Sequence, residues 1–292
     1  MQHIKIVFLV WLPLVIGAQQ QIPVGNFALP VSQQPSPLFS FGQNILNQGD
    51  GEVFETFTLL RGKHKRVIVN QITALYGVND RWSLLVTIPA PVSNKENGKT
   101  TTAFGDIFFQ SEYVLWDYDS ETASSELTAV GSIFLPSGIL DAATFDVEAD
   151  DEASTGTGSI SFFLGTTFNY TTADWYFFTS YGGIITTERE GTRIGNSLFY
   201  QAGIGYNLHY FPDKILLLLI ELDGIWTKKS IFADVVNPNS GGNIIFLGPS
   251  LWYSTEKLTL QVGIQAPVFQ KLNGVQNKDS YFFACEAIWK FN

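Results

Sequence analysis

The chain has 292 residues, of which 45% are hydrophobic, 14% aromatic and only 15% charged, and its net charge is −10. A soluble protein normally carries about 25% charged residues, and a nucleic-acid partner requires a positive surface, so this composition argues against both classes. A single cysteine excludes a disulfide scaffold.

The first element is a candidate leader. Lys5 is followed by an apolar run over residues 6–16 and then by Gly17-Ala18, which is the order of regions in a secretory signal peptide. We therefore expect residues 1–18 to be a signal peptide and Gln19 to be the first mature residue. The alternative, a retained anchor helix, is disfavoured because the run is shorter than the roughly 20 residues that a bilayer requires.

An arm with no regular pattern follows the leader. Residues 19–51 are rich in Pro and Gln, contain almost no charge and show no sustained period. This composition predicts an extended segment. The arm would either pack inside the structure that follows or lie free beside it, and composition does not separate the two.

From residue 52 onward, apolar and polar residues alternate in segments of about ten, separated by turn signals, which is typical of a transmembrane β-barrel. The longest apolar run in this part, residues 215–220, is far too short for a membrane helix. We therefore predict an all-β fold, a transmembrane antiparallel β-barrel over residues 52–292, with the arm as an extension or a plug of the lumen. The twelve predicted strands are residues 52–60, 66–77, 82–92, 104–116, 125–136, 159–170, 175–186, 193–210, 215–227, 243–253, 258–269 and 280–291.

The lengths of the connections orient this barrel. An even number of strands places both ends on one side, which is the periplasmic side in barrels of the bacterial outer membrane. The connections on the periplasmic side are all short: they are residues 78–81, 117–124, 171–174, 211–214 and 254–257. Those at the other end include residues 93–103, 137–158, 228–242 and 270–279, which are long and polar. Short periplasmic turns and long outer loops are expected of an outer-membrane barrel.

Tryptophan gives a second indication. Indole rings prefer the interface between membrane and water, and four of them fall beside predicted periplasmic strand ends. In a soluble β-sandwich, which is the alternative, tryptophan has no reason to recur beside every second turn. The predicted membrane-interface belt consists of Trp82, Trp116, Trp175 and Trp289.

Alternation also assigns one face of each strand to the lumen. Charges facing lipid at mid-depth are costly, so the acidic side chains of the strands are expected to point inward, together with several phenylalanines. Such a mixed lining suits amphipathic or aromatic solutes better than bare ions; the alternative is a set of hydrogen-bonded groups that brace the barrel. The lumen-lining candidates are Asp106, Phe108, Gln110, Glu112, Glu126, Phe163, Phe199, Gln201, Glu221, Asp223 and Glu286.

Catalytic and metal-binding patterns are weak. The mature chain contains only His64 and His209, neither beside a nucleophile pattern, so we expect no enzyme activity, no metal site and no cofactor. The basic tip at residues 61–66 would meet lipopolysaccharide phosphates or simply be a solvated hairpin end. The expected partners are outer-membrane lipid and lipopolysaccharide, small hydrophobic or aromatic solutes and the barrel-assembly machinery, with no nucleic acid.

Four stretches carry a resemblance: residues 37–41 (PLFSF), 49–56 (GDGEVFET), 75–82 (LYGVNDRW) and 104–107 (FGDI). Together they resemble the phenol-degradation meta-pathway (MetA-pathway) family of bacterial outer-membrane transporters, over residues 37–135. The arm departs from that family in lacking an Asp-Arg-Pro element. The chain ends Phe291-Asn292, where a terminal aromatic residue is usual for recognition by the assembly machinery, and Phe291 would serve instead.

The resemblance implies uptake of aromatic compounds. Combined with the barrel pattern, it leads us to expect a channel in the outer membrane of a Gram-negative bacterium that passively admits small hydrophobic or aromatic molecules. The alternative is a non-conducting structural or surface-interaction barrel, whose lumen is filled by side chains or by the arm.

Overall fold

The computed structural model describes residues 24–139 and 155–291. The predicted signal peptide, residues 1–18, lies outside the described residues. Segments in which apolar and polar residues alternate, rich in β-branched and aromatic side chains, form long strands. Each strand pairs antiparallel with the next long strand in the chain. The long strands are β1 (Gly51–Gly62), β2 (Lys65–Asn79), β3 (Trp82–Glu96), β5 (Ile107–Asp119), β6 (Ala123–Leu135), β7 (Ser161–Thr172), β8 (Trp175–Thr186), β9 (Ser197–Asn207), β10 (Lys214–Thr227), β13 (Gly242–Thr255), β14 (Leu258–Leu272) and β15 (Asp279–Phe291).

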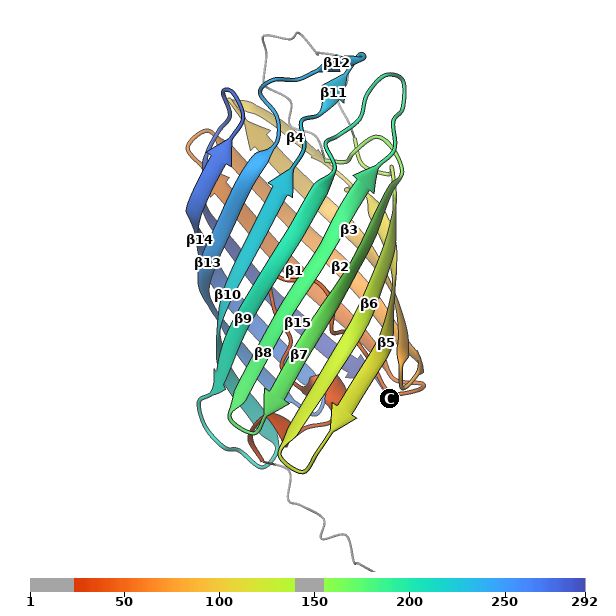
Figure 1. The fold of residues 1–292 in the computed structure, drawn as a ribbon, viewed down its shortest axis with the longest axis vertical. Coiled ribbons are helices and arrows are strands. Elements are labelled where there is room, and N and C mark those ends of the chain that lie inside the picture. The colour runs from red at the N-terminus through yellow and green to blue at the C-terminus, as the bar shows by residue number, and fades with distance from the viewer. Residues whose placement is uncertain (1–23, 140–154, 292) are drawn as a thin grey trace, which may run out of the picture.

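These strands close into one barrel (Figure 1). The first strand pairs with the last along its whole length, from Gly51 opposite Phe291 to Gly62 opposite Asp279. On its other side, β1 pairs with β2, and the series continues around the wall. The fold is therefore a closed, twelve-stranded antiparallel barrel, and the predicted all-β fold is confirmed.

The ends of the barrel differ as predicted. The turns between β2 and β3, β7 and β8, and β13 and β14 have two residues each, and they lie at the same end as the C-terminus (Figure 1). The long connections lie at the opposite end. There, the short strand β4 (Lys99–Ala103) pairs with the outer part of β3. Within the connection from β10 to β13, β11 (Ile231–Phe232) and β12 (Val235–Val236) form a small hairpin.

Two predicted strands begin too early. The segment predicted at residues 104–116 is β5, which starts at Ile107, because the backbone N–H of Gly105 turns to donate to Pro89 O, at 2.9 Å. The segment predicted at residues 193–210 is β9, which is shorter at both ends. Its start is delayed because Arg193 exchanges backbone hydrogen bonds with Ile231 of the outer hairpin, 2.8 Å each, instead of with a wall strand.

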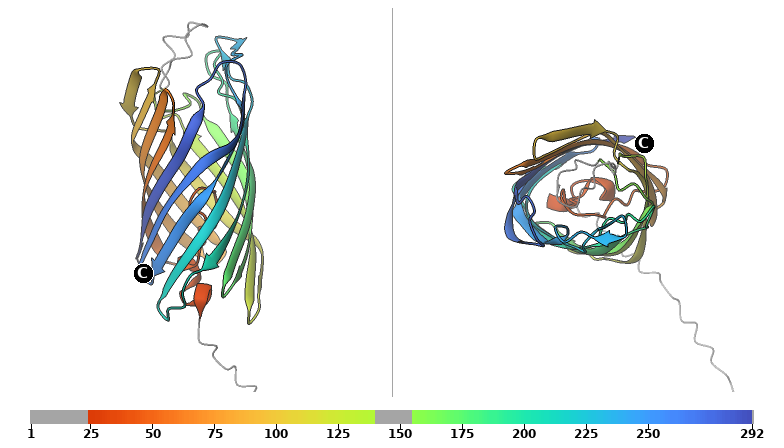
Figure 2. Two further views of the ribbon diagram at one scale, coloured as in Figure 1. Left: turned by 90° about the vertical axis from the view of Figure 1, so that its left-hand side faces the viewer. Right: turned by 90° about the horizontal axis from the view of Figure 1, so that it is seen from above.

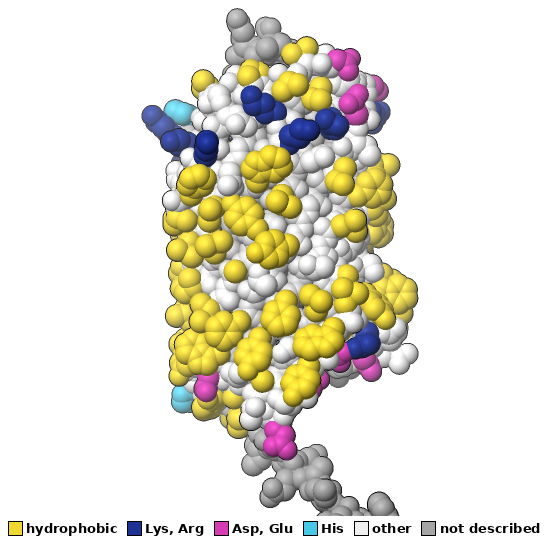
Figure 3. All heavy atoms as spheres, viewed as in Figure 1, with side chains coloured by type: hydrophobic (Ala, Val, Ile, Leu, Met, Phe, Trp, Pro, Cys, Tyr) yellow, Lys and Arg dark blue, Asp and Glu magenta, His cyan; other side chains and the backbone are white. Residues whose placement is uncertain are grey.

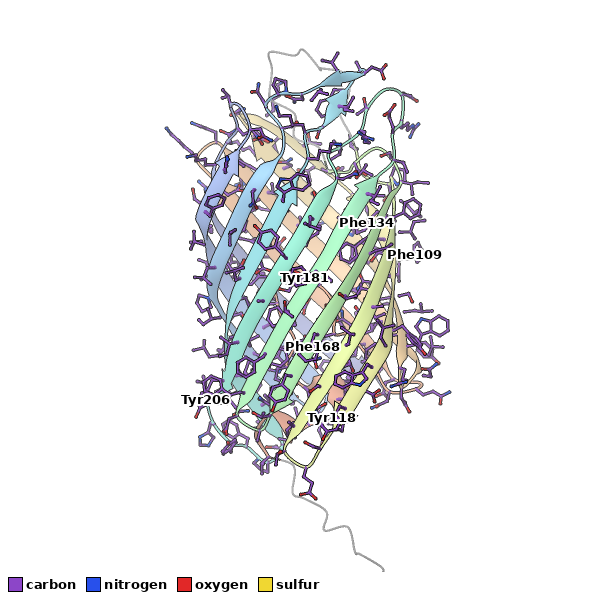
Figure 4. All side chains as sticks on the ribbon, viewed as in Figure 1. Phe109, Tyr118, Phe134, Phe168, Tyr181 and Tyr206 are labelled. Atoms are coloured by element: carbon purple, nitrogen blue, oxygen red, sulfur yellow. The ribbon has the colours of Figure 1, made fainter. Side chains whose placement is uncertain are left out.

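The outer surface of the wall is apolar. Leu164 on β7 is 71% exposed and Tyr181 on β8 is 60% exposed, and Figure 4 shows Phe109, Phe168, Tyr181 and Tyr206 along the outside of the strands. Hydrophobic side chains cover the middle of this face, while Lys and Arg gather near the outer end (Figure 3). A protein in water would bury such a band, whereas a bilayer requires it.

The inside of the barrel is filled at its periplasmic end by the arm (Figure 2). The arm contains two 3₁₀ turns, η1 (Gly25–Phe27) and η2 (Val31–Gln33). Each of two buried clusters contains one leucine of the arm: Leu29 packs with Tyr176, Trp252 and the inward leucines of β10, and Leu46 packs with Phe54, Leu75, Leu85 and Ile288. Among the described residues, no helix has the length and hydrophobicity to span a bilayer.

Candidate solute pathway

The arm makes a loop inside the lumen. It starts at the periplasmic end, where the backbone N–H of Asn26 donates to Ala173 O in the β7–β8 turn, at 2.9 Å. It rises to the middle of the barrel, where Phe41 meets Phe163 of the wall edge to face with ring centroids 4.6 Å apart. It then descends and joins β1 at Gly51. The sequence left the place of the arm open, and the structure puts it in the lumen.

Two inward carboxylates of β10 hold the top of this loop. Glu221 accepts hydrogen bonds from the backbone N–H groups of Leu38 and Phe39, both at 3.1 Å, and from the Ser250 hydroxyl. Asp223 accepts from Ser40 Oγ at 2.9 Å. Both side chains are buried, and neither forms an ion pair with a described residue. Their hydrogen-bonding capacity is used by the arm and by polar groups of the wall.

The descending part is held in the same way. Glu112 of β5 accepts from the backbone N–H of Asn44 at 2.9 Å and from its side-chain amide at 2.7 Å. At the base, the ammonium group of Lys290 lies 2.8 Å from the Asp50 carboxylate and donates to Ser32 Oγ at 2.6 Å. Lys290 therefore ties the entering and leaving ends of the loop to β15.

Wall glycines leave room for the arm. An added Cβ at Gly263 of β14 would lie 2.6 Å from the ring of Phe39 and 3.0 Å from Leu38. At Gly165 of β7 it would lie 2.7 Å from the ring of Phe41. Such distances are below those of real Cβ contacts, so side chains at these positions would displace the arm. The wall and the arm are thus complementary in shape as well as in hydrogen bonding.

The loop separates two cavities. The outer cavity, of about 350 Å³, has residues 36–42 of the arm as its floor. The inner cavity, of about 610 Å³, lies between the arm and the β5–β6 hairpin at the periplasmic end. Residues of the arm line both cavities, so the arm lies between them.

The lining of the outer cavity is mixed. Several of its polar groups are hydrogen-bonded: Glu286 accepts from Thr56 Oγ1 at 2.6 Å, and Gln110 donates to Glu112 at 2.7 Å and accepts from Ser132 Oγ at 2.8 Å. The remaining surface is largely aromatic, so it offers ring faces and edges with a few fixed polar positions. The wall phenylalanines that line this cavity are Phe54, Phe108, Phe134, Phe163 and Phe199.

Apart from Asp106, the lumen-lining candidates lie in three places. Phe108, Gln110, Phe163, Phe199, Gln201 and Glu286 line the outer cavity, whereas Glu126 lines the inner one and is bonded to Thr128 of its own strand at 2.7 Å. Glu112, Glu221 and Asp223 contact the arm.

Asp106 is in a different place from the one expected. It precedes β5 at the outer rim, where its carboxylate accepts from Gly138 N at 2.9 Å and Thr157 N at 2.7 Å. It fastens the ends of the β6–β7 connection, and its assignment to the inner face of a strand is corrected. Gly105 takes the chain out of the strand path just before it.

The arm itself supplies residues to the site that were not among the predicted lumen-lining candidates. Phe39 and Phe41 form part of the outer cavity, and Gln33 is a buried hydrogen-bonding centre that joins Glu52, Ser254 and Thr259. The available signal was the presence of phenylalanines, including Phe39 and Phe41, in a Pro- and Gln-rich segment without a regular period, since exposed aromatic rings are costly in a free arm.

The four belt tryptophans lie on the outer surface near the periplasmic end, and each is between 37% and 48% exposed. Trp175 packs against Tyr206 with ring centroids 4.8 Å apart, and Trp82 donates from Nε1 to Ser111 Oγ at 2.9 Å. Trp252, by contrast, is buried in the lumen. An indole has an apolar ring and a polar N–H group, so these tryptophans suit the interface between membrane and water.

The histidines show no catalytic arrangement within the described residues. The ring of His209 packs against Phe211, with centroids 4.4 Å apart, and its backbone N–H donates to Asn207. Within residues 24–139 and 155–291, no group of three or more His, Cys, Asp or Glu side chains has the geometry of a metal site.

Comparison with solved structures finds outer-membrane barrels among the similar chains. The COG4313 outer membrane channel from Pseudomonas putida F1 superposes with a TM-score of 0.68 at 13% identity, over 84% of this chain and 97% of that one. The NanC porin gives 0.49 at 12% identity, over 82% and 100%, and the toluene transporter TbuX from Ralstonia pickettii gives 0.37 at 10% identity, over 85% and 92%. No protein-family model matches the sequence, and comparison with curated proteins gives no match either.

The closed barrel, its apolar outer band and its likeness in fold to the COG4313 channel define the class. The protein is a twelve-stranded β-barrel of the bacterial outer membrane, with the segment that precedes its first strand folded into the lumen.

Proposed function

We propose that the protein is an outer-membrane channel for passive uptake of small hydrophobic or aromatic compounds, with the arm as its gate. The observation that carries the proposal is the outer cavity: phenylalanine rings from six elements surround a space of about 350 Å³ above the arm. Aromatic solutes gain edge-to-face contacts in such a lining, and the hydrogen-bonded polar groups between the rings would orient a hydroxyl or carboxylate.

Passage requires no cofactor or energy source. A solute would enter from the outer end, exchange weak contacts with the cavity wall and reach the periplasm when the arm moves aside. The resemblance to the MetA-pathway transporters and the likeness in fold to the COG4313 channel support this assignment. Export would depend on residues 1–18 as a signal peptide.

The second candidate is a non-conducting structural or surface-interaction barrel. It is favoured by the extent to which the arm is fixed, since Glu112, Glu221, Asp223 and Lys290 all bind it. In this case the arm is a permanent part of the core, and the outer loops carry the function.

Single-channel conductance in planar bilayers separates the two. The mature protein is compared with a variant lacking residues 19–48, in the presence and absence of phenol or benzoate. Openings that aromatic solutes block, more frequent in the deletion variant, are expected of a gated aromatic conduit. A folded deletion variant that stays silent would contradict the proposal and leave the structural barrel. If the deletion prevents folding, the point variant Glu221→Gln, which weakens the hydrogen bonds that hold the arm, replaces the deletion variant in the same recording.

A further inference from the structure

A third cavity lies on the outside of the barrel, away from the solute pathway. It has a volume of about 680 Å³ and is formed at the outer ends of β10, β13 and β14 with the connections beside them. We call it the rim pocket. It contains four of the 17 basic residues of the chain, and of the described residues that line it, none is acidic. The basic residues are Arg193, Lys228, Lys229 and Lys271.

Strand register shows that the rim pocket faces the membrane side. Trp226 of β10 is opposite Asn243 of β13, which is opposite Lys271 of β14. Residues directly opposite one another lie on the same face of a sheet, and Trp226 is 47% exposed on the outer face. Tyr200, from β9, donates to Asn243 Oδ1 at 2.7 Å on this face.

The cations of the rim pocket are available for an external anion. None of the four forms an ion pair with another described residue. At the basic tip of residues 61–66, one of the four Lys and Arg side chains is paired: Lys65 lies 3.5 Å from Asp279. A cluster of like charges is unfavourable unless a counter-charge is bound, and the protein as a whole is acidic, so the clustering calls for a specific partner.

The location indicates what that partner is. Lys and Arg side chains gather directly above the hydrophobic band on the face of β9, β10 and β13 (Figure 3). In a barrel whose apolar band spans the hydrocarbon core, side chains directly above that band lie at the level of the lipid headgroups. Trp226, Ile231 and Val236 supply apolar lining beside the cations, which a lipid would cover and a free phosphate ion would not. Two or more cations around one phosphate form strong, charge-assisted hydrogen bonds.

We propose that the rim pocket binds a phosphorylated glycolipid of the outer leaflet, that is, the phosphosugar head of lipopolysaccharide. Arg193, Lys229 and Lys271 contact the phosphate groups, and Trp226 packs beneath the sugar and the start of the acyl chains. This site is separate from the lumen, so it holds whether or not the barrel conducts.

The test is retention of lipid by the purified, full barrel, measured by native mass spectrometry. The probes are lipopolysaccharide, phosphate-free lipid A and inorganic phosphate alone. The variant Lys229→Gln/Lys271→Gln is expected to retain lipopolysaccharide about tenfold less well, because two charge-assisted contacts are lost. Arg193→Gln tests the same pocket from a different segment and is expected to act in the same direction.

Two controls remove the same charge elsewhere: Lys214→Gln/Lys257→Gln at the periplasmic ends of the same strands, and Arg61→Gln/Lys63→Gln at the basic tip. Both are expected to retain lipid like the parent. Equal retention by all variants, or a loss only in the tip variant, would overturn the proposal. Retention of phosphate-free lipid A equal to that of lipopolysaccharide would also overturn it. Binding of inorganic phosphate as tight as that of the lipid would assign the pocket to a free anion instead.

Discussion

The carboxylate of Glu221 accepts a hydrogen bond from the backbone N–H of Leu38 at 3.1 Å, although the two residues are 183 positions apart in the chain. This contact joins an acidic wall strand to the arm that precedes the barrel. It explains how the barrel interior carries this buried acid without an ion-pair partner among the described residues: Glu221, like Glu112, accepts hydrogen bonds from the backbone of the arm. The arm and the acidic side chains that line the lumen are therefore held together as one structure.

Glu221→Gln is expected to loosen the arm. Charge-assisted hydrogen bonds are about twice as strong as neutral ones, and Glu221 accepts from two backbone N–H groups and one hydroxyl. Losing about 1.4 kcal/mol from these contacts would raise the open fraction of the channel about tenfold. Single-channel recording measures the open probability.

Glu126→Gln is the matched control, because this inward acid bonds Thr128 of its own strand rather than the arm. Its open probability should equal that of the parent. If both variants change the open probability to the same extent, the effect comes from lumen charge and not from the arm.

Gly263→Val is expected to displace the arm by volume. A Cβ at this position would lie 2.6 Å from the ring of Phe39, and overpacking of a filled core costs about 1–3 kcal/mol. The folded barrel should therefore unfold at a lower temperature, seen as loss of its heat-modifiable migration on gels. Gly131→Val is the control: its Cβ would be 3.6 Å from Leu164, which is ordinary contact on the outer face. Equal unfolding temperatures for the two variants would contradict the tight fit of the arm.

Phe163→Leu is expected to weaken the interaction of the outer cavity with aromatic solutes. Phe163 lines that cavity and lies against Phe41, and an aromatic pair contributes about 0.5–1.5 kcal/mol beyond its buried area. The phenol concentration that blocks half of the current of the mature protein, with its arm in place, should rise by about 3 to 10 times. Phe162→Leu changes the same residue type on the opposite, 46% exposed face. A similar rise in that variant would show that the outer cavity is not where phenol binds.

The tryptophan belt is testable by its depth in the bilayer. Single-tryptophan proteins that retain Trp82, Trp116, Trp175 or Trp289 should be quenched most strongly by lipids brominated near the headgroup, because indole rings prefer that level. A protein that retains only Trp252, buried in the lumen, should be shielded from every brominated lipid. If bromines at the ends of the acyl chains quench these four tryptophans more strongly than bromines near the headgroup, the four do not lie at the membrane interface, which would contradict the predicted belt.

The sequence by itself determined the wall. Alternation has a period of two, so a strand that meets lipid on one face and water or polar groups on the other has a readable pattern. The short turns, the long outer loops and the outward tryptophans followed from that pattern. The ends of β5 and β9 did not follow, because Gly105 and Arg193 form hydrogen bonds outside the wall that local alternation does not encode.

Only the tertiary structure decided what fills the lumen. The arm has no period, and its partners are single carboxylates and hydroxyls on distant strands, such as Glu112, Glu221 and Ser83. Alternation predicted that these acids point inward, but not that the backbone N–H groups of the arm would meet them. A backbone donor is the same for every residue type except proline, so its pairing with a distant side chain leaves no mark in the sequence and appears only when the barrel closes.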